Sequence, residues 1–472
     1  MDLPAGLSHS FRKEPCTSAL TLLDAALIAY LALPLLIFCA WFKLPVATAL
    51  AVLLSYSLWT LRSEVRWREL GVRPVTIATI AVVALVWTAI AGVGHFFYAN
   101  TDWIVRDAVL RDLTATAWPP QYPVDGDFAL YLWTALGLTL FLCAVTELFS
   151  TPRQRAVAVA LMIAFGGLDL IGYSLSRGAI PRASQHLEAW SRLAQYSSNS
   201  TLLFWVPNHA LPAWLGMALI LRLWRQPALA RIAPLMAAAI PLWSPLSAIG
   251  LAPFYVAGLN WRRDFLGLVA IRTGLPFLAM AFIVARYVTL DSQTIPGGWA
   301  FAGKPLDLYL TQYLSFCLIE FGIIAWALHR LGAYDLPLTI AVAVLLLLPL
   351  YQFGLANDLA MRSSIPALTV LALATVRPIV DHERSAWRWV LIIVLLLGAA
   401  GAAHEPIRAF ALPRWKMSGR TLPQSLEPNA GDTFPLLPSN YAANLNQPGL
   451  AAMLREPTMV RPYPAPASKG TP

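Results

Sequence analysis

Long apolar segments alternate with short polar ones along most of the chain. A helix that crosses a bilayer needs about 20 consecutive, mostly apolar residues. Segments near this length are expected at 21–41, 46–61, 75–98, 128–149, 157–176, 203–224, 232–244, 246–260, 265–288, 309–330, 336–355, 364–380 and 388–404. The pattern predicts an all-α fold, a polytopic transmembrane helix bundle with about 13 crossings over residues 1–404 and short juxtamembrane helices in its outer loops.

Two of these segments, 232–244 and 246–260, are short and contain Pro241, Pro245 and Pro253. They predict either two short helices or a re-entrant hairpin, which membranes tolerate only where protein or a cavity surrounds it.

Composition agrees with a membrane protein and limits the partners. Hydrophobic residues make up 58% of the chain and charged residues 12%, whereas soluble domains carry about 25% charged residues. The net charge of +9 does not require a nucleic-acid partner, because Lys and Arg in short cytoplasmic loops give membrane proteins a positive net charge. We therefore expect no nucleic-acid partner. The four cysteines show no CxxC spacing, so neither a disulfide framework nor a zinc site is expected. The N-terminal region resembles an uncleaved first helix rather than a signal peptide.

Arginines predict the orientation. Those on one side of the expected bundle are Arg62, Arg66, Arg68, Arg73, Arg153, Arg155, Arg222, Arg225, Arg262, Arg263, Arg384 and Arg388. The positive-inside rule makes this side cytoplasmic. The extracytoplasmic side then holds loops 99–127, 177–202, 289–308 and 356–363 and a Pro-rich tail, 405–472. We expect a bacterial inner (cytoplasmic) membrane, with the N-terminus inside and the C-terminus outside.

Charges crowd into the first of these outer loops. Eleven residues contain Asp102, Arg106, Asp107, Arg111 and Asp112. Charge at a membrane boundary is costly and usually functional. The spacing predicts a short interfacial helix over 102–113, with Asp102 paired to Arg106 and Asp107 to Arg111 at i,i+4. Asp102 therefore has two interpretations, a reactive carboxylate or a helix cap.

Several other polar side chains fall inside or at the ends of apolar segments. They are Glu147, Asp169, Asn208, His209, Arg272, Arg286, Glu320, Asn357, Asp358 and Arg362. Each is a functional candidate by its location. The alternatives are structural: ion pairs for the carboxylates, a packed hydrogen bond for His209, and interfacial snorkelling for Arg286 and Arg362.

The chain resembles the C-type glycosyltransferase superfamily (GT-C). The features that carry this are a span, an outer loop that begins with Asp102, an amphipathic juxtamembrane helix and many further spans. The strings NTDWIVRDAVLRDL, WPPQYPVDGD, QYSSNSTLLFWVPNHALPAWL and NDLAMRSSIPAL are also similar to a set of uncharacterised bacterial multi-pass proteins, over about residues 75–380. GT-C enzymes place this loop after their first span, whereas here it follows the third, so the segment 21–61 would be an added hairpin.

The resemblance implies a sugar transfer from a polyprenyl-phosphate donor to a glycan or lipid acceptor. Asp102 would be the base, with Asp107 or Asp127 as helper or metal ligand, and Asp169 and His209 as further catalytic candidates. The implied substrate-binding residues are Trp103, Arg106, Asp127, Asn208, Arg286, Asn357, Asp358 and Arg362. Trp103, Trp118 and Trp205 would stack on a sugar or belong to the interfacial aromatic belt. No metal-ligand set stands out, which leaves a role for Mg²⁺ or Mn²⁺ open.

Other functions remain open at this point. A transporter or flippase of a lipid-linked glycan would need Glu147, Asp169, Arg272 and Glu320 to converge in one transmembrane cavity. An envelope-polysaccharide polymerase or ligase, an acyltransferase and an assembly scaffold are further alternatives. Convergence of Asp102, Asp169, Asn208, His209 and Arg362 at the outer face would favour transfer.

Overall fold

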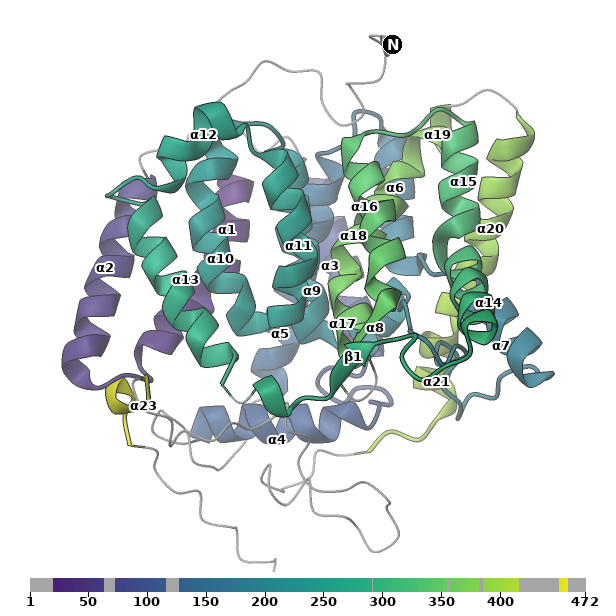
Figure 1. Cartoon of the computed structure of the whole chain (residues 1–472), viewed down its shortest axis with the longest axis horizontal. Helices are drawn as coiled ribbons and strands as arrows, with labels where there is room; N and C mark the ends of the chain where they lie inside the picture. Colours follow the sequence, from purple (N-terminus) through teal and green to yellow (C-terminus); the bar gives the residue numbers. More distant parts are fainter. Residues whose placement is uncertain are drawn as a thin grey trace, which may run out of the picture.

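The computed structural model describes residues 20–62, 73–115, 127–290, 292–354, 357–381, 385–415 and 450–456. These residues are mostly helical with almost no strand, which confirms the all-α prediction. Strands β1 (Gly297–Trp299) and β2 (Tyr351–Phe353) pair antiparallel. Most helices stand side by side, while α4 (Asp102–Ala115) lies across one end of the bundle and α12 (Trp261–Leu268) lies at the other (Figure 1). We call these the α4 end and the α12 end.

Six helical stretches in the described part are long and apolar enough to cross a membrane. They are Leu22–Cys39 (α1), Leu44–Arg62 (α2), Pro152–Arg177, Leu306–Arg330, Asp358–Asp381 and Ala386–Ala411. Shorter apolar helices cover Pro74–Ile90 (α3), Leu132–Thr146, Pro227–Trp243 (α10), Pro245–Gly258 (α11), Gly274–Val288 (α13) and Leu336–Leu350. The chain is therefore a multi-pass membrane protein, and the count of about 13 crossings stays a prediction.

Four of the long stretches are subdivided. Their parts are α6 (Pro152–Ala164) and α7 (Asp169–Arg177); α14 (Leu306–Cys317) and α15 (Ile323–Arg330); α17 (Asp358–Ser363), α18 (Ile365–Ala374) and α19 (Val376–Asp381); and α20 (Ala386–Ala402) and α21 (His404–Ala411). The remaining helices are α5 (Asp127–Thr146), α8 (Asn199–Trp205), α9 (Pro207–Arg222), α16 (Leu336–Leu347) and α23 (Leu450–Met453). Helix α21 thus occupies the beginning of the predicted tail.

Local sequence explains where several helices begin. The side chains of Thr21 and Thr151 each accept a hydrogen bond from the backbone N–H three residues later. The side chains at those later positions, Asp24 and Gln154, accept in turn from the backbone N–H of the threonine. This capping box satisfies N–H groups that a helix start leaves free. Ser244 separates α10 from α11 and caps the latter through Ser247 N, so the Pro-rich pair forms two helices joined at a single residue.

Helix α9 is the centre of the bundle. Nearly all of its residues are buried, and it packs against α5, α10, α11 and α18. Trp214 of α9 stacks on Phe141 of α5, with ring centroids 5.4 Å apart. A helix that is apolar on every face belongs in a core, and this position lets the first turn of α9 meet several helices at the α4 end.

The position of Arg272 differs from the prediction. It was expected about two turns inside a span, but it lies in the turn that precedes α13. The apolar run that starts at Phe265 is divided, because α12 ends at Leu268 and the chain turns before Gly274. The Arg272 carbonyl lies 3.5 Å from Thr60 Oγ1 of α2, so this turn lies beside α2.

Candidate functional site

Helix α4 is anchored to the bundle by two residues at its start. Asn100 Nδ2 and Trp103 Nε1 both donate to the carbonyl of Phe204 in α8, at 2.7 and 2.8 Å. Trp103 is fully buried, so its ring forms part of the core and does not face the surface where a sugar would stack. The anchor fixes the next turn of α4 against the beginning of α9.

Arg106 connects α4 to α9. Its Nη2 donates to Asp102 Oδ2 at 3.2 Å, which is the predicted i,i+4 pair, and its Nε donates to Asn208 Oδ1 at 3.2 Å. Its third nitrogen, Nη1, is buried and has no hydrogen-bond partner among the described residues. Asp102 keeps a 38% exposed side chain. A buried guanidinium N–H without an acceptor is costly, so this group is available to an anion.

His209 follows Asn208 and is held by two serines of α11. Ser247 Oγ donates to the His209 carbonyl at 3.0 Å, and Ser244 Oγ donates to Ser247 Oγ at 2.7 Å. Because the Ser244 proton is used in this way, His209 Nδ1 must donate to Ser244 Oγ, at 2.7 Å. In the neutral imidazole this assigns the lone pair to Nε2, which makes Nε2 the acceptor of the ring.

Arg362 of α17 completes the group from a fourth helix. It forms an ion pair with Asp358, while Asn357 caps α17 and donates to the Leu193 carbonyl at 3.2 Å. The next residue, Ser363, donates from its Oγ to the Leu246 carbonyl of α11 at 2.6 Å, which holds this part of α17 against the turn that contacts His209. We call Asp102, Arg106, Asn208, His209, Ser244 and Arg362 the Arg106–His209 cluster. It brings together side chains from α4, α9 and α17 with Ser244, the cap of α11. Of the five residues whose convergence would favour sugar transfer, it contains all except Asp169.

Asp107 has a partner that the sequence did not suggest. Its Oδ2 lies 2.6 Å from His95 Nε2, and both side chains are almost buried. His95 has a left-handed φ of +56°, and its ring packs edge-on against Trp415 at 4.4 Å. The side chain of Arg111 lies outside the described residues. Asp107 therefore ties α4 to the end of α3 and to the segment after α21.

Asp169 belongs to a second polar group. Asp169 and Glu320 are each 1% exposed, and Trp190 Nε1 lies 3.2 Å from Asp169 Oδ1 and 3.0 Å from Glu320 Oε1. The group lies where α6 and α7 are interrupted and where Leu318–Gly322 forms a π-helical turn, a distortion often found at functional sites. The interruption brings Asp169 to Glu320 rather than to Asp102. We call Asp169, Glu320 and Trp190 the carboxyl cluster.

The loop that carries Trp190 contains two further buried ionisable residues. Glu188 accepts from Ser198 N at 3.0 Å and from Thr201 Oγ1 at 2.6 Å, and burial raises the pKa of its carboxyl group. Burial lowers the pKa of His186, but the Glu405 and Glu188 carboxylates outweigh this and raise it overall. These contacts fasten the loop to α8 and α21.

The four charged residues proposed for a transport path do not converge in one cavity. Asp169 and Glu320 lie together, whereas Glu147 binds Arg222, with Oε2 2.5 Å from Nη1. Asp24, which the sequence did not single out, binds Arg222 Nε at 2.6 Å. The resulting triad of α1, α5 and α9 lies toward the α12 end, and Arg272 is in a turn.

Three other predicted site residues lie outside both clusters or outside the described part of the chain. Arg286 is exposed near the end of α13. Asp127 begins α5, but its side chain lies outside the described residues, as does Trp118. Among the residues that the structure describes, no three His, Cys, Asp or Glu side chains are grouped to hold a metal ion, so no reaction step is assigned to a metal here.

The chain matches no family model, no curated protein and no solved structure. The resemblance to GT-C enzymes therefore stays a prediction from layout and from Asp102. Sequence reasoning missed Ser244, a member of the cluster, and Ser247, which supports Ser244 and His209. Their sequence signal is weak, since Ser244 lies between two Pro-rich apolar helices and resembles an ordinary helix cap.

Proposed function

We propose that this protein is a membrane glycosyltransferase. It would move a sugar from a polyprenyl-phosphate donor to an envelope glycan or lipid acceptor at the α4 end. The observation that carries the proposal is the Arg106–His209 cluster, in which a buried, unpartnered guanidinium nitrogen lies beside a partly exposed carboxylate. A phosphate leaving group needs a cation that stabilises its charge, and an acceptor hydroxyl needs a base that takes its proton.

The orientation forms part of the proposal. Arginines mark the α12 end, since Arg62 ends α2, Arg153 lies in the first turn of α6 and Arg262 lies on α12. The positive-inside rule then makes the α12 end cytoplasmic and the α4 end extracytoplasmic. With about 13 crossings of a bacterial inner membrane, the N-terminus would be inside and the C-terminus outside.

The reaction follows from the groups present. Arg106 would bind the donor phosphate through Nη1, since a planar guanidinium matches phosphate oxygens, and Arg362 would add positive charge. The acceptor oxygen attacks the anomeric carbon while Asp102 takes its proton. The bond from that carbon to the phosphate oxygen breaks, and its electron pair leaves with the phosphate. Asn208 and His209 would orient the substrates.

One observation favours a second function. The carboxyl cluster lies at a break between two membrane helices, and transporters place ionisable groups at such breaks. A flippase of a lipid-linked glycan would use this cluster instead of the Arg106–His209 cluster. A polysaccharide polymerase or ligase would use the same donor chemistry with a longer acceptor.

Changing Arg106 to Gln tests the proposed phosphate site. The variant should lose about 10- to 100-fold in its preference for undecaprenyl phosphate over uncharged undecaprenol, because it loses charged hydrogen bonds. The measurement is a binding titration of both lipids with purified protein. Arg177→Gln, which removes an exposed arginine at the α4 end, is the control and should keep the wild-type preference. An unchanged preference in Arg106→Gln would exclude this arginine as the phosphate ligand.

A further inference from the structure

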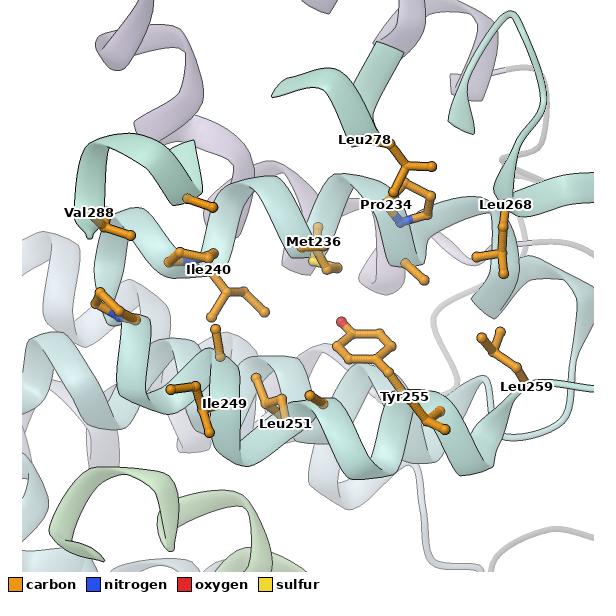
Figure 2. Close-up of a pocket in the computed structure, with 18 of the residues that line it drawn as sticks. Pro234, Met236, Ile240, Ile249, Leu251, Tyr255, Leu259, Leu268, Leu278 and Val288 are labelled. Atoms are coloured by element: carbon orange, nitrogen blue, oxygen red, sulfur yellow. The ribbon is translucent and has the colours of Figure 1, made fainter. Parts of the chain in front are cut away.

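An apolar groove of about 500 Å³ lies between α10, α11 and α13 (Figure 2). Pro241 and Val288 line it toward the α4 end, and Leu259, Trp261 and Leu268 line it at the α12 end. Helix α11 has 14 residues, or about 20 Å at 1.5 Å per residue. One leaflet of a bilayer is about 15 Å of hydrocarbon. The groove is therefore long enough for the acyl chain of a lipid.

A tyrosine hydroxyl lies within this largely apolar lining. The Tyr255 side chain projects from α11 into the space facing α10 (Figure 2). Its hydroxyl is buried and has no hydrogen-bond partner among the described residues. Tyr255 lies three residues before the end of α11 at Gly258, which is about 5 Å along the helix. The interfacial layer of a leaflet has a similar thickness, about 5–8 Å, so the hydroxyl would reach the lipid ester groups where α11 ends at the membrane surface.

The α12 end of the groove is basic. Arg262 and Arg272 are exposed there, and Arg263 binds both Asp264 and the Arg225 carbonyl. The hydrogen bond from Arg263 lowers the pKa of Asp264, so this one nearby acid is engaged. Exposed Trp261, Phe265 and Leu266 of α12 give the helix the apolar side chains that sit among lipid headgroups.

We propose that the groove binds an anionic phospholipid of the leaflet at the α12 end. One acyl chain lies along α10, α11 and α13, an ester carbonyl accepts from the Tyr255 hydroxyl, and the phosphate lies near Arg262 and Arg272. The arginines and the hydroxyl are at the opposite end from the Arg106–His209 cluster. They therefore fit a lipid whose headgroup is at the α12 end better than the chain of a donor whose phosphate is at the α4 end. The site does not depend on the proposed transfer reaction.

Lipid retention tests this site without an activity assay. The protein is reconstituted with equal amounts of phosphatidylglycerol and phosphatidylethanolamine, purified, and examined for bound lipid by native mass spectrometry. Wild type should retain phosphatidylglycerol preferentially. The double variant Arg262→Gln/Arg272→Gln should lose about fivefold of this preference for each arginine removed. The control Arg73→Gln/Arg153→Gln, exposed at the same end on α3 and α6, should keep it.

Two single variants separate the chain site from the headgroup site. Tyr255→Phe should weaken retention of both lipids and leave their ratio unchanged, and Ala252→Trp, which fills the groove, should remove both. The proposal is overturned if Arg262→Gln/Arg272→Gln retains phosphatidylglycerol like wild type. It is also overturned if added undecaprenyl phosphate displaces all bound lipid from wild type and from this double variant alike, since the groove would then hold the donor chain.

Discussion

Asp102→Asn should lower kcat for sugar transfer by about 100-fold or more, because a positioned general base contributes about 10²- to 10⁴-fold. The amide has nearly the same shape as the carboxylate but cannot take a proton from the acceptor. The Asp102 side chain is partly exposed and its carboxylate accepts from Arg106, while the backbone N–H of Asp102, which the substitution keeps, donates to Asn100 Oδ1, so the fold should survive. The measurement is the single-turnover rate with a radiolabelled polyprenyl-phosphate sugar in proteoliposomes.

Asp307→Asn is the matched control for this variant. Asp307 is also an exposed acid in the first turn of a helix at the α4 end, and its replacement should leave the rate unchanged. A wild-type rate in Asp102→Asn would contradict the base assignment. In that case His209 Nε2, the ring nitrogen left as the acceptor by Ser244, would be the group to test with His209→Gln.

Arg222→Met should cause the largest loss of stability. Arg222 is buried and binds Asp24 and Glu147, so its removal leaves two carboxylates facing each other without a cation. Breaking a buried ion pair in this way costs about 3–5 kcal/mol. We expect a clear fall in the midpoint of thermal unfolding of the detergent-solubilised protein, read by tryptophan fluorescence.

A triple variant checks the physical reason. Asp24→Asn/Glu147→Gln/Arg222→Met removes all three charges, and it should recover a large part of the lost stability, since neutral groups are cheaper to bury than unpaired charges. Arg153→Gln, an exposed arginine near the same end, should have no effect. Equal stability of wild type and Arg222→Met would show that the triad does not hold α1, α5 and α9 together.

The helices were predictable where one physical signal dominates. Apolar length predicted the apolar helices, while the number of crossings stays a prediction, and the Thr21 and Thr151 capping boxes are visible as local sequence patterns. Arg272 was misplaced because an apolar run does not show that the chain turns between α12 and α13. That turn lies beside α2, which is far away in sequence.

The site was predictable only in part. The pair of Asp102 and Arg106 follows from i,i+4 spacing on one helix, and Asn208 and His209 stood out as polar residues in an apolar stretch. Their meeting could not be read from the sequence, because Arg106 and Asn208 are 102 positions apart. Trp103 looked like a stacking residue, yet its indole N–H anchors α4 to Phe204. Single sequences do not distinguish an aromatic ring in the core from one at a surface.

The most direct test of the proposed function is the position of the donor phosphate. A cryo-electron microscopy map of the protein in nanodiscs with a non-hydrolysable polyprenyl-phosphate sugar would show it. Our account predicts the phosphate within hydrogen-bond distance of Arg106 Nη1, about 3 Å, with the sugar beside Asp102 and His209. A phosphate bound at the carboxyl cluster, or away from Arg106 and Arg362, would contradict the account.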